Sequence, residues 1–291
     1  MFNESEWESL KPFKSNKKSE EDLKEKKRYR FQTAYLICEF LCKKTSIKEF
    51  TIKSNKIGDE GMCIIAEAFN GYKTSLSHLN ISQTSITWVS FGKILKELKN
   101  NHVLLSLVAD KNNLNTPHTF SAVGNLIKSA SAIKNLSLAE CHLTDTFGLA
   151  FAIAMKYNKH LVKFNLYDNE ITSETIKQLA TSLDEAVSMN LEEFNLGKNN
   201  INDEGGVKLA HAIRNHRSLK RINLNNNALT DETALAFNRN IPINKIIEEV
   251  NLAKNLINLR VLEMVNHTCL KIKEGKINAI VPELTKEKDG M

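Results

Sequence analysis

One arrangement of apolar side chains recurs along most of this 291-residue chain. Its clearest copy places Leu161, Phe164, Leu166, Asn169 and Ile171 at fixed intervals. Successive copies begin 28 to 30 residues apart, at Ile47, Leu76, Leu104, Ile133, Leu161, Leu191, Leu219 and Ile247. Eight registered copies of one short unit predict a stack of coils, because a unit of this size cannot bury its apolar face alone.

Each copy contains a short strand. Apolar residues two positions apart, such as Phe164 and Leu166, point to the same face of an extended chain. The flanking Leu161 and Ile171 turn inward where the chain enters and leaves the strand. Parallel stacking of neighbouring strands then buries one continuous core, which must be mostly aliphatic because aromatic residues make up only 7% of the chain. We expect one residue of each central coil to line up on adjacent rungs: Leu138, Leu166, Leu196 and Leu224.

An asparagine follows the strand in six of the eight copies: Asn55, Asn112, Asn169, Asn199, Asn227 and Asn255. The chain bends at this position. A side-chain amide both donates and accepts, so we predict that these asparagines are structural and satisfy backbone groups that the bend and the next coil leave unpaired. Cys141 and Thr84 occupy the same position in the other two copies.

A helix is predicted between each strand and the next. The stretch from Asp203 to Ile213 has apolar residues at helical spacing and small residues on its inner side. Thr172, Asn202 and Thr230 each precede such a stretch and have an acidic residue one or two positions later. They are typical of helix starts, since the side-chain oxygen caps free N–H groups and an acid is favoured beside the helix N-terminus.

A strand–loop–helix unit of 28 or 29 residues with this frame resembles the ribonuclease-inhibitor type of leucine-rich repeat. The same type occurs in the Ran GTPase-activating protein and in several ciliary proteins. The resemblance covers residues 47–257, eight leucine-rich repeats. It implies an α/β fold, a leucine-rich repeat solenoid shaped as a horseshoe, with parallel strands on the concave face and helices on the convex face.

The N-terminal end is predicted to combine an arm with a capping helix. Residues 1–30 are expected to form a basic, partly disordered arm, because residues 11–30 carry nine basic and four acidic side chains in a protein of net charge +6. The arm is a solvated tail, a segment that contacts an acidic surface, or a nuclear-import signal. Helical spacing from Phe31 to Leu41 predicts a helix over 31–46 that closes the first coil.

The C-terminal end is predicted to cap the last coil. Within residues 258–291, Leu259, Leu262 and Val265 indicate a short helix. Alternating apolar residues from 270 to 281 then predict a hairpin that covers the last coil.

The composition indicates a soluble cytoplasmic protein. Hydrophobic residues make up 42% and charged residues 25% of the chain, so it has enough apolar surface to fold. Five cysteines are an odd and sparse number, which favours a reducing compartment. No apolar run approaches the ~20 residues that a membrane span needs. Residues 1–10 contain three acidic residues and no basic one, unlike a secretory signal.

The sequence shows no recognisable catalytic or metal-binding pattern. Cys38 and Cys42 lie four residues apart on a predicted helix and supply at most half of a tetrahedral zinc site, so we expect buried thiols. His211 and His216 are expected to be surface histidines. There is no glycine-rich phosphate loop and no ordered set of nucleophile and base. We therefore predict that the chain is not an enzyme and binds neither a cofactor nor a metal.

A partner is expected on the concave face, which the outward-pointing strand side chains should line. The predicted binding residues are Lys163, Tyr167, Glu193, Asn195, Arg221, Asn223, Asn225 and Glu249. Balanced charge in these rows argues against a nucleic acid on the concave face. Tyr167 and Arg221 are the residue types that most often anchor a protein. The asparagines have an equally good structural explanation, in which their amides satisfy one another along the sheet.

These observations predict a non-catalytic scaffold that binds protein partners, within a larger complex. The resemblance to ciliary proteins narrows this expectation to a structural subunit of a cytoskeletal or ciliary assembly. Two alternatives stay open: a GTPase-activating protein of the Ran-directed type, and an enzyme inhibitor. Ribonuclease inhibitors are cysteine-rich and acidic, and this chain departs from them on both counts.

Overall fold

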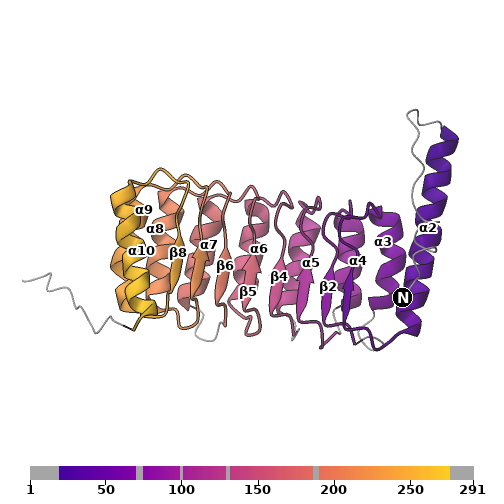
Figure 1. The fold of residues 1–291 in the computed structure, drawn as a ribbon, viewed down its shortest axis with the longest axis horizontal. Helices are drawn as coiled ribbons and strands as arrows, with labels where there is room; N and C mark the ends of the chain where they lie inside the picture. The colour runs from indigo at the N-terminus through magenta and orange to yellow at the C-terminus, as the bar shows by residue number, and fades with distance from the viewer. Residues whose placement is uncertain (1–19, 70–74, 99–100, 129–131, 186–189, 276–291) are drawn as a thin grey trace, which may run out of the picture.

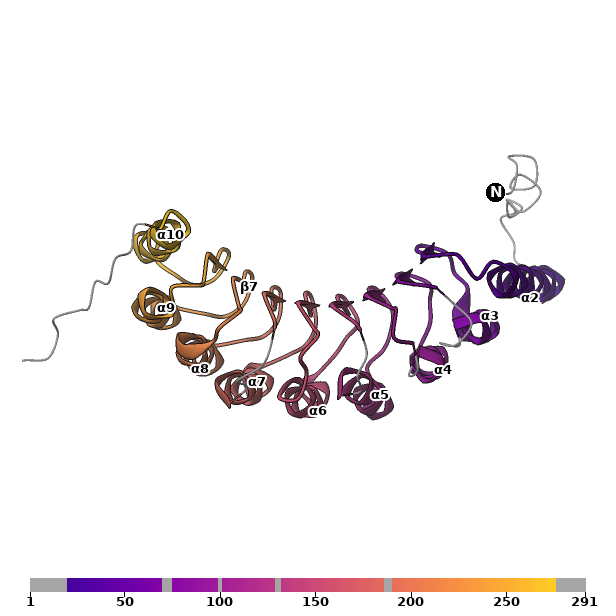
Figure 2. The ribbon, with the colours of Figure 1, turned by 90° about the horizontal axis from the view of Figure 1, so that it is seen from below.

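The computed structural model describes residues 20–69, 75–98, 101–128, 132–185 and 190–275. Within these ranges, eight strands form one parallel sheet in which every strand pairs with its neighbours in sequence. Figure 2 shows the strands on the inside of a curved stack and the helices on the outside. The predicted horseshoe solenoid is therefore confirmed.

Each strand is only three residues long. The strands are β1 (Glu49–Thr51), β2 (His78–Asn80), β3 (Ser106–Val108), β4 (Asn135–Ser137), β5 (Lys163–Asn165), β6 (Glu193–Asn195), β7 (Arg221–Asn223) and β8 (Glu249–Asn251). A helix precedes β1 and a helix follows every strand, and Figure 1 shows these helices side by side. They are α2 (Glu20–Lys43), α3 (Gly58–Ala66), α4 (Trp88–Leu98), α5 (Pro117–Lys128), α6 (Asp145–Met155), α7 (Ser173–Glu185), α8 (Asp203–Ala212), α9 (Asp231–Asn244) and α10 (Leu259–Lys273). Single 3₁₀ turns at Glu67–Phe69 and Ile213–Asn215 extend α3 and α8.

The predicted aliphatic spine lies in register. Phe164 of β5 stands opposite Leu136 and Phe194 of the neighbouring strands. The backbone ladder continues past the strand ends, where the N–H groups of Leu166 and Leu196 donate to the next rung at 2.8 Å. The four residues expected to align, Leu138, Leu166, Leu196 and Leu224, are each 0% exposed.

The repeated asparagine joins three segments of backbone. Asn169 Nδ2 donates to the carbonyl oxygens of Leu138 and Leu166, at 3.0 Å each. Its Oδ1 accepts from the N–H groups of Cys141 and Leu143, also at 3.0 Å. Asn112, Asn199, Asn227 and Asn255 make the same kind of bridge to the preceding coil. Each of these amides therefore connects two coils as well as closing a bend.

An aspartate at the start of some helices reaches the next helix. Asp145 of α6 accepts from the hydroxyls of Thr172 and Thr175, at 2.6 Å each, and from both backbone N–H groups. Burial raises its carboxyl pKa, but these hydrogen bonds outweigh burial and hold the pKa of Asp145 below its usual range. Asp59 and Asp203 make equivalent bonds and have lowered pKa values for the same reasons. We expected an acid beside the helix dipole but not a bond that crosses to the following coil.

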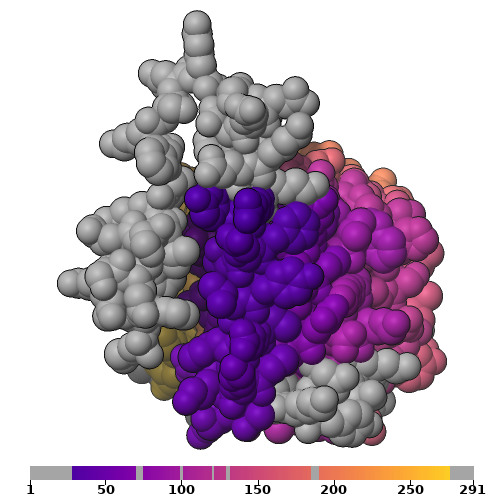
Figure 3. All heavy atoms as spheres, turned by 90° about the vertical axis from the view of Figure 1, so that its right-hand side faces the viewer, coloured from indigo at the N-terminus to yellow at the C-terminus, as the bar shows by residue number. Residues whose placement is uncertain are grey.

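The N-terminal helix is longer than predicted. We expected a helix over 31–46, and α2 instead runs from Glu20 to Lys43, so it takes up part of the expected arm. Acidic residues at its start and basic residues further on are the order that helices favour, which explains the earlier start. Residues 1–19 of the arm lie outside the described residues. Figure 3 looks onto this end, where α2 packs against α3 through the buried Ala34.

The predicted C-terminal hairpin is wrong where the structure describes it. Residues 270–273 form the last turn of α10, because the helical spacing of the buried Val265 and Cys269 continues into this turn. Gly275 then takes a left-handed conformation with φ of +67°, which ends the helix. Residues 276–281 of the hairpin lie outside the described ranges. In the part of the chain that is described, no helix has both the length and the apolar character needed to cross a bilayer.

Candidate functional site on the concave face

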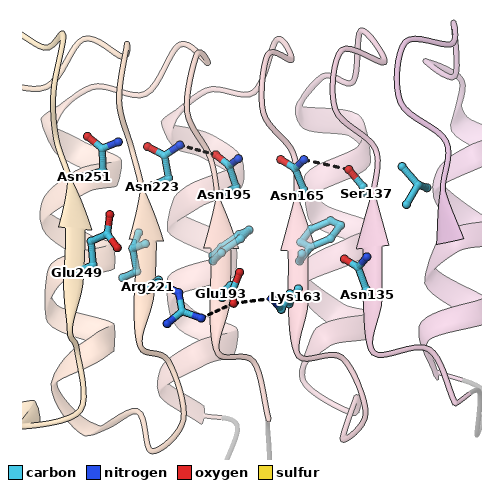
Figure 4. A pocket seen from close by; sticks show the side chains of 14 residues that line it. Asn135, Ser137, Lys163, Asn165, Glu193, Asn195, Arg221, Asn223, Glu249 and Asn251 are labelled. Carbon is cyan, nitrogen blue, oxygen red and sulfur yellow. Dashed lines mark hydrogen bonds and ion pairs between the residues drawn. The ribbon is translucent and has the colours of Figure 1, made fainter. Parts of the chain in front are cut away.

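The predicted concave rows are brought together by the register of the central strands. Lys163, Glu193, Arg221 and Glu249 are the first residues of β5 to β8 and stand opposite one another in sequence order. A second row follows two residues later and consists of Asn165, Asn195, Asn223 and Asn251. Figure 4 shows both rows on the open face of the sheet. They line a shallow hollow of about 480 Å³ whose floor includes Phe164, Phe194 and Ile222.

Charge in the first row is compensated within the row. Glu193 lies between two cations, with Lys163 Nζ 2.8 Å from its Oε1 and Arg221 paired with the same oxygen. Burial raises the pKa of Glu193, but the hydrogen bonds from Lys163 and Arg221 outweigh it and lower the pKa below its usual range. Arg221 also reaches Glu248, at 3.7 Å. The row is therefore a chain of alternating charges and not a basic or an acidic strip.

The asparagines of the second row are largely occupied by their own sheet. Asn165 Nδ2 donates to Ser137 Oγ, and Asn223 Nδ2 donates to Asn195 Oδ1, both at 2.9 Å. Each Oδ1 accepts from the backbone N–H two residues further on, at 3.0 to 3.1 Å. Among the described residues, Asn195 Nδ2 and Asn251 Nδ2 donate no hydrogen bond. These two N–H₂ groups keep both of their hydrogens for a partner, and Asn165 and Asn223 keep one each.

Tyr167 and Asn225 lie beyond the hollow, where the strands bend. Between them lies Gly197, at which a Cβ would stand 2.1 Å from Asn225 Oδ1 and 3.0 Å from a ring carbon of Tyr167. The glycine thus leaves room for the Asn225 amide beside the tyrosine ring. Asn225 Oδ1 is buried and has no hydrogen-bond partner among the described residues.

An aromatic stack supports the hollow from inside the core. The Phe164 ring centroid lies 4.2 Å from that of Phe151 on α6 and 5.8 Å from that of Phe194. Phe147 continues the stack at 5.3 Å from Phe151. These buried rings hold β5 and β6 against the helices, so the concave rows sit on a packed base.

The sequence analysis did not identify one set of buried polar residues. His216 was expected at the surface, but it is 5% exposed, and its Nδ1 accepts from the N–H groups of Ser218 and Leu219. Burial lowers its pKa to about 4. Asn101, Asn158 and Asn244 accept in the same way from the residues before their strands. The sequence does contain a pattern that could have identified them. All four residues stand three positions before the first apolar residue of the repeated unit.

Comparison with known proteins agrees with the repeat architecture. A family model described as a leucine-rich repeat matches residues 43–62, 187–210 and 215–237. The ribonuclease inhibitor of Sus scrofa is 25% identical over 149 residues, which are 51% of this chain and 33% of that protein. The human NACHT, LRR and PYD domains-containing protein 13 is 26% identical over 147 residues, which are 50% of this chain and 14% of that protein. The chain spans less than half the length of these relatives.

Two solved structures are also similar. Leiomodin-1 actin-binding site 2 aligns with a TM-score of 0.42 at 14% identity, over 62% of this chain and 88% of that chain. The tropomodulin C-terminal domain from Caenorhabditis elegans aligns with a TM-score of 0.39 at 16% identity, over 62% of this chain and 92% of that chain.

The repeated frame, the parallel sheet and the matched sequences together define the class of protein. The chain is a solenoid of leucine-rich repeats whose sequence is similar to that of ribonuclease inhibitors.

Proposed function

We propose that this protein is a non-catalytic scaffold that binds a protein partner on its concave face. The observation that carries the proposal is the pair of in-register rows on β5 to β8, which present Lys163, Glu193 and Arg221 beside the free amide donors of Asn195 and Asn251. Backbone ladders and the aromatic stack fix the positions of these groups, so a partner loses little entropy in ordering them.

The chemistry of the rows indicates what kind of partner fits. The amide donors of Asn195 and Asn251 suit the carbonyl groups of a protein surface. The Tyr167 ring and the Arg221 guanidinium are the anchors. Because Glu193 neutralises Lys163 and Arg221, the rows offer little attraction to a polyanion. The same compensation gives no support to inhibition of a basic enzyme, which calls for an uncompensated acidic surface.

The proposal includes a narrower assignment to a structural subunit of a cytoskeletal or ciliary assembly. This part rests on the resemblance of the repeat type to that of ciliary proteins. Fractionation of native cells tests it: the protein should sediment with the detergent-insoluble cytoskeleton or the axoneme. Recovery of all of the protein in the detergent-soluble fraction would refute the narrower assignment and leave the scaffold proposal standing.

A photo-crosslinking experiment tests the concave site itself. A benzophenone amino acid in place of Tyr167 should crosslink one recurrent protein in native cells, because an aromatic side chain is retained at the anchor. The same amino acid in place of Lys208, exposed on the convex helix α8, is the matched control. The Arg221→Ala change should abolish the Tyr167 crosslink. Equal crosslinking from both positions, or none from Tyr167, would contradict the proposal.

The GTPase-activator alternative has a direct assay. Single-turnover GTP hydrolysis by a small GTPase of the Ran class should proceed at the same rate with and without this protein if it is a scaffold. An accelerated rate would replace the proposal with the alternative.

A further inference from the structure

The solenoid separates charge onto its two edges. All of the helices from α3 to α10 run in the same direction, so their N-terminal ends lie on one edge and their C-terminal ends on the other, which is the lower edge in Figure 1. Helix N-termini favour acids and helix C-termini favour bases. Asp59, Asp145, Asp203 and Asp231 accordingly lie in the first turns of their helices. Acids therefore gather in the first turns along one edge, and Lys96, Lys128, Lys271 and Lys273 lie in the last turns of α4, α5 and α10 along the opposite, lysine-rich edge.

In the middle of the solenoid, the positive charge of the lysines on this edge is not neutralised by ion pairs between described residues. Lys128 ends α5, Lys134 precedes β4, and Lys159 lies between α6 and β5, and all three are exposed. Among the described residues, none of the three forms an ion pair. The Lys134 carbonyl accepts from the N–H groups of Val162 and Lys163, so Lys134 lies beside the segment that carries Lys159. Three segments of the sequence that lead into β3, β4 and β5 contain no acidic residue: 101–109, 128–138 and 156–166.

An apolar stripe on α6 runs down to this edge. Leu149, Ile153 and Tyr157 lie four residues apart, and their exposed fractions are 52%, 49% and 64%. After Asp145, α6 contains no charged residue. The neighbouring helices are polar at the positions equivalent to Leu149 and Ile153: Ser121 and Asn125 on α5, and Lys177 and Thr181 on α7. Exposed apolar residues gathered in this way mark an interaction surface more often than single ones do.

The stripe and the lysines meet at the end of α6. Tyr157 follows the last residue of the helix by two positions and Lys159 by four, while α5 with its terminal Lys128 packs against α6. We infer that these six residues form a second docking surface, on the convex side, for an acidic amphipathic protein segment. Apolar side chains of the partner cover Leu149, Ile153 and Tyr157, and its carboxylates lie over Lys128, Lys134 and Lys159. This surface is separate from the concave rows.

The chemistry of the surface favours a protein segment over a nucleic acid or a lipid headgroup. Phosphate groups bind best at helix N-termini and to arginine, which contacts two oxygens at once. This edge consists of helix C-termini, and the sequence has no arginine between Arg30 and Arg214. The apolar stripe also has no counterpart on a phosphate backbone, whereas an amphipathic helix carries apolar residues at the same four-residue spacing.

Peptide selection against the full-length protein tests the inference. A phage library of random 16-residue peptides is panned on the wild-type chain. The selected peptides are then measured by fluorescence anisotropy against two triple variants. One replaces the lysines (Lys128→Glu, Lys134→Glu, Lys159→Glu), and the other replaces the stripe (Leu149→Ser, Ile153→Ser, Tyr157→Ser). The matched control is Lys53→Glu, Lys56→Glu, Lys208→Glu, which changes the net charge equally at exposed lysines elsewhere.

The expected peptides are acidic and carry apolar residues three or four positions apart. Their affinity should fall at least tenfold in each of the two surface variants and less than twofold in the control. Arg221→Ala should leave it unchanged, which separates this surface from the concave site. The inference is overturned if no acidic peptide is selected, or if the control weakens binding as much as the lysine variant does. Tighter binding of single-stranded RNA or anionic vesicles that depends on the lysines but not on the stripe also overturns it.

Discussion

Replacing Asn169 by alanine should destabilise the protein strongly, because this one amide bridges two coils. Alanine would leave four backbone groups without their partners: the carbonyls of Leu138 and Leu166 and the N–H groups of Cys141 and Leu143. Asn169 is 8% exposed, so water reaches these groups poorly. An unpaired buried group costs ~1–3 kcal/mol. Allowing for water that enters the vacated space, we expect a loss of about 3–5 kcal/mol from the same principle.

Asn55 provides the matched control within the same chain. It holds the equivalent position in the first coil, but it is exposed, and among the described residues it donates only to the carbonyls of Ile52 and Lys53 of its own coil. Water can replace both bonds, so Asn55→Ala should cost less than ~1 kcal/mol. Urea unfolding followed by circular dichroism measures both losses. If Asn169→Ala costs no more than Asn55→Ala, the bridging role of the asparagine is refuted.

Three further predictions concern the core, the helix starts and the bends. Leu166→Ala, which empties a fully buried position, should cost ~2–5 kcal/mol in urea unfolding, and a loss as small as that of a surface change would show that the register is wrong there. Because the folded pKa values of Asp145 and Asp203 lie below their unfolded values, their stabilisation is present above about pH 4 and is lost as the pH falls through the folded pKa. The Asp145→Asn, Asp203→Asn double variant should therefore lose less stability than the wild type between pH 5 and pH 3, and parallel pH profiles would contradict this. Lys198 has φ of 53°, so Lys198→Val should lower the melting temperature and Lys198→Gly should not, whereas equal melting temperatures would argue against the left-handed bend.

The strand register could be predicted from the sequence because two independent periods agree. Phe164 and Leu166 alternate with outward residues at a period of two, and the same pair returns every 28 to 30 residues. A slip of one residue would turn Phe164 outward, so only one register buries the core. The concave residues followed from this register alone, and Glu193 therefore lies opposite Lys163 and Arg221 as the alignment requires.

Other features depend on contacts that form only when the chain folds, and the repeated sequence pattern does not show these contacts. His216 was interpreted as a surface residue because its role depends on backbone N–H groups that face it only after the chain turns. The hairpin expected over 270–281 was wrong for residues 270–273, which belong to α10. An alternating pattern over so few residues does not distinguish a strand from a helix. The separation of charge onto two edges follows from the common direction of the helices, so the net charge of +6 gave no sign of it.

Distances between spin labels on the concave face test the stacked-coil architecture most directly. Labels in place of the exposed Glu49 and Glu249 stand seven strand spacings apart, and labels in place of His78 and Glu249 stand six apart. With about 4.8 Å per spacing, the first pair should lie roughly 30 to 35 Å apart, and the second should be closer by about one spacing. Two narrow distributions with this offset would support the ladder of coils. Broad distributions, or a first pair closer than about 20 Å, would contradict it.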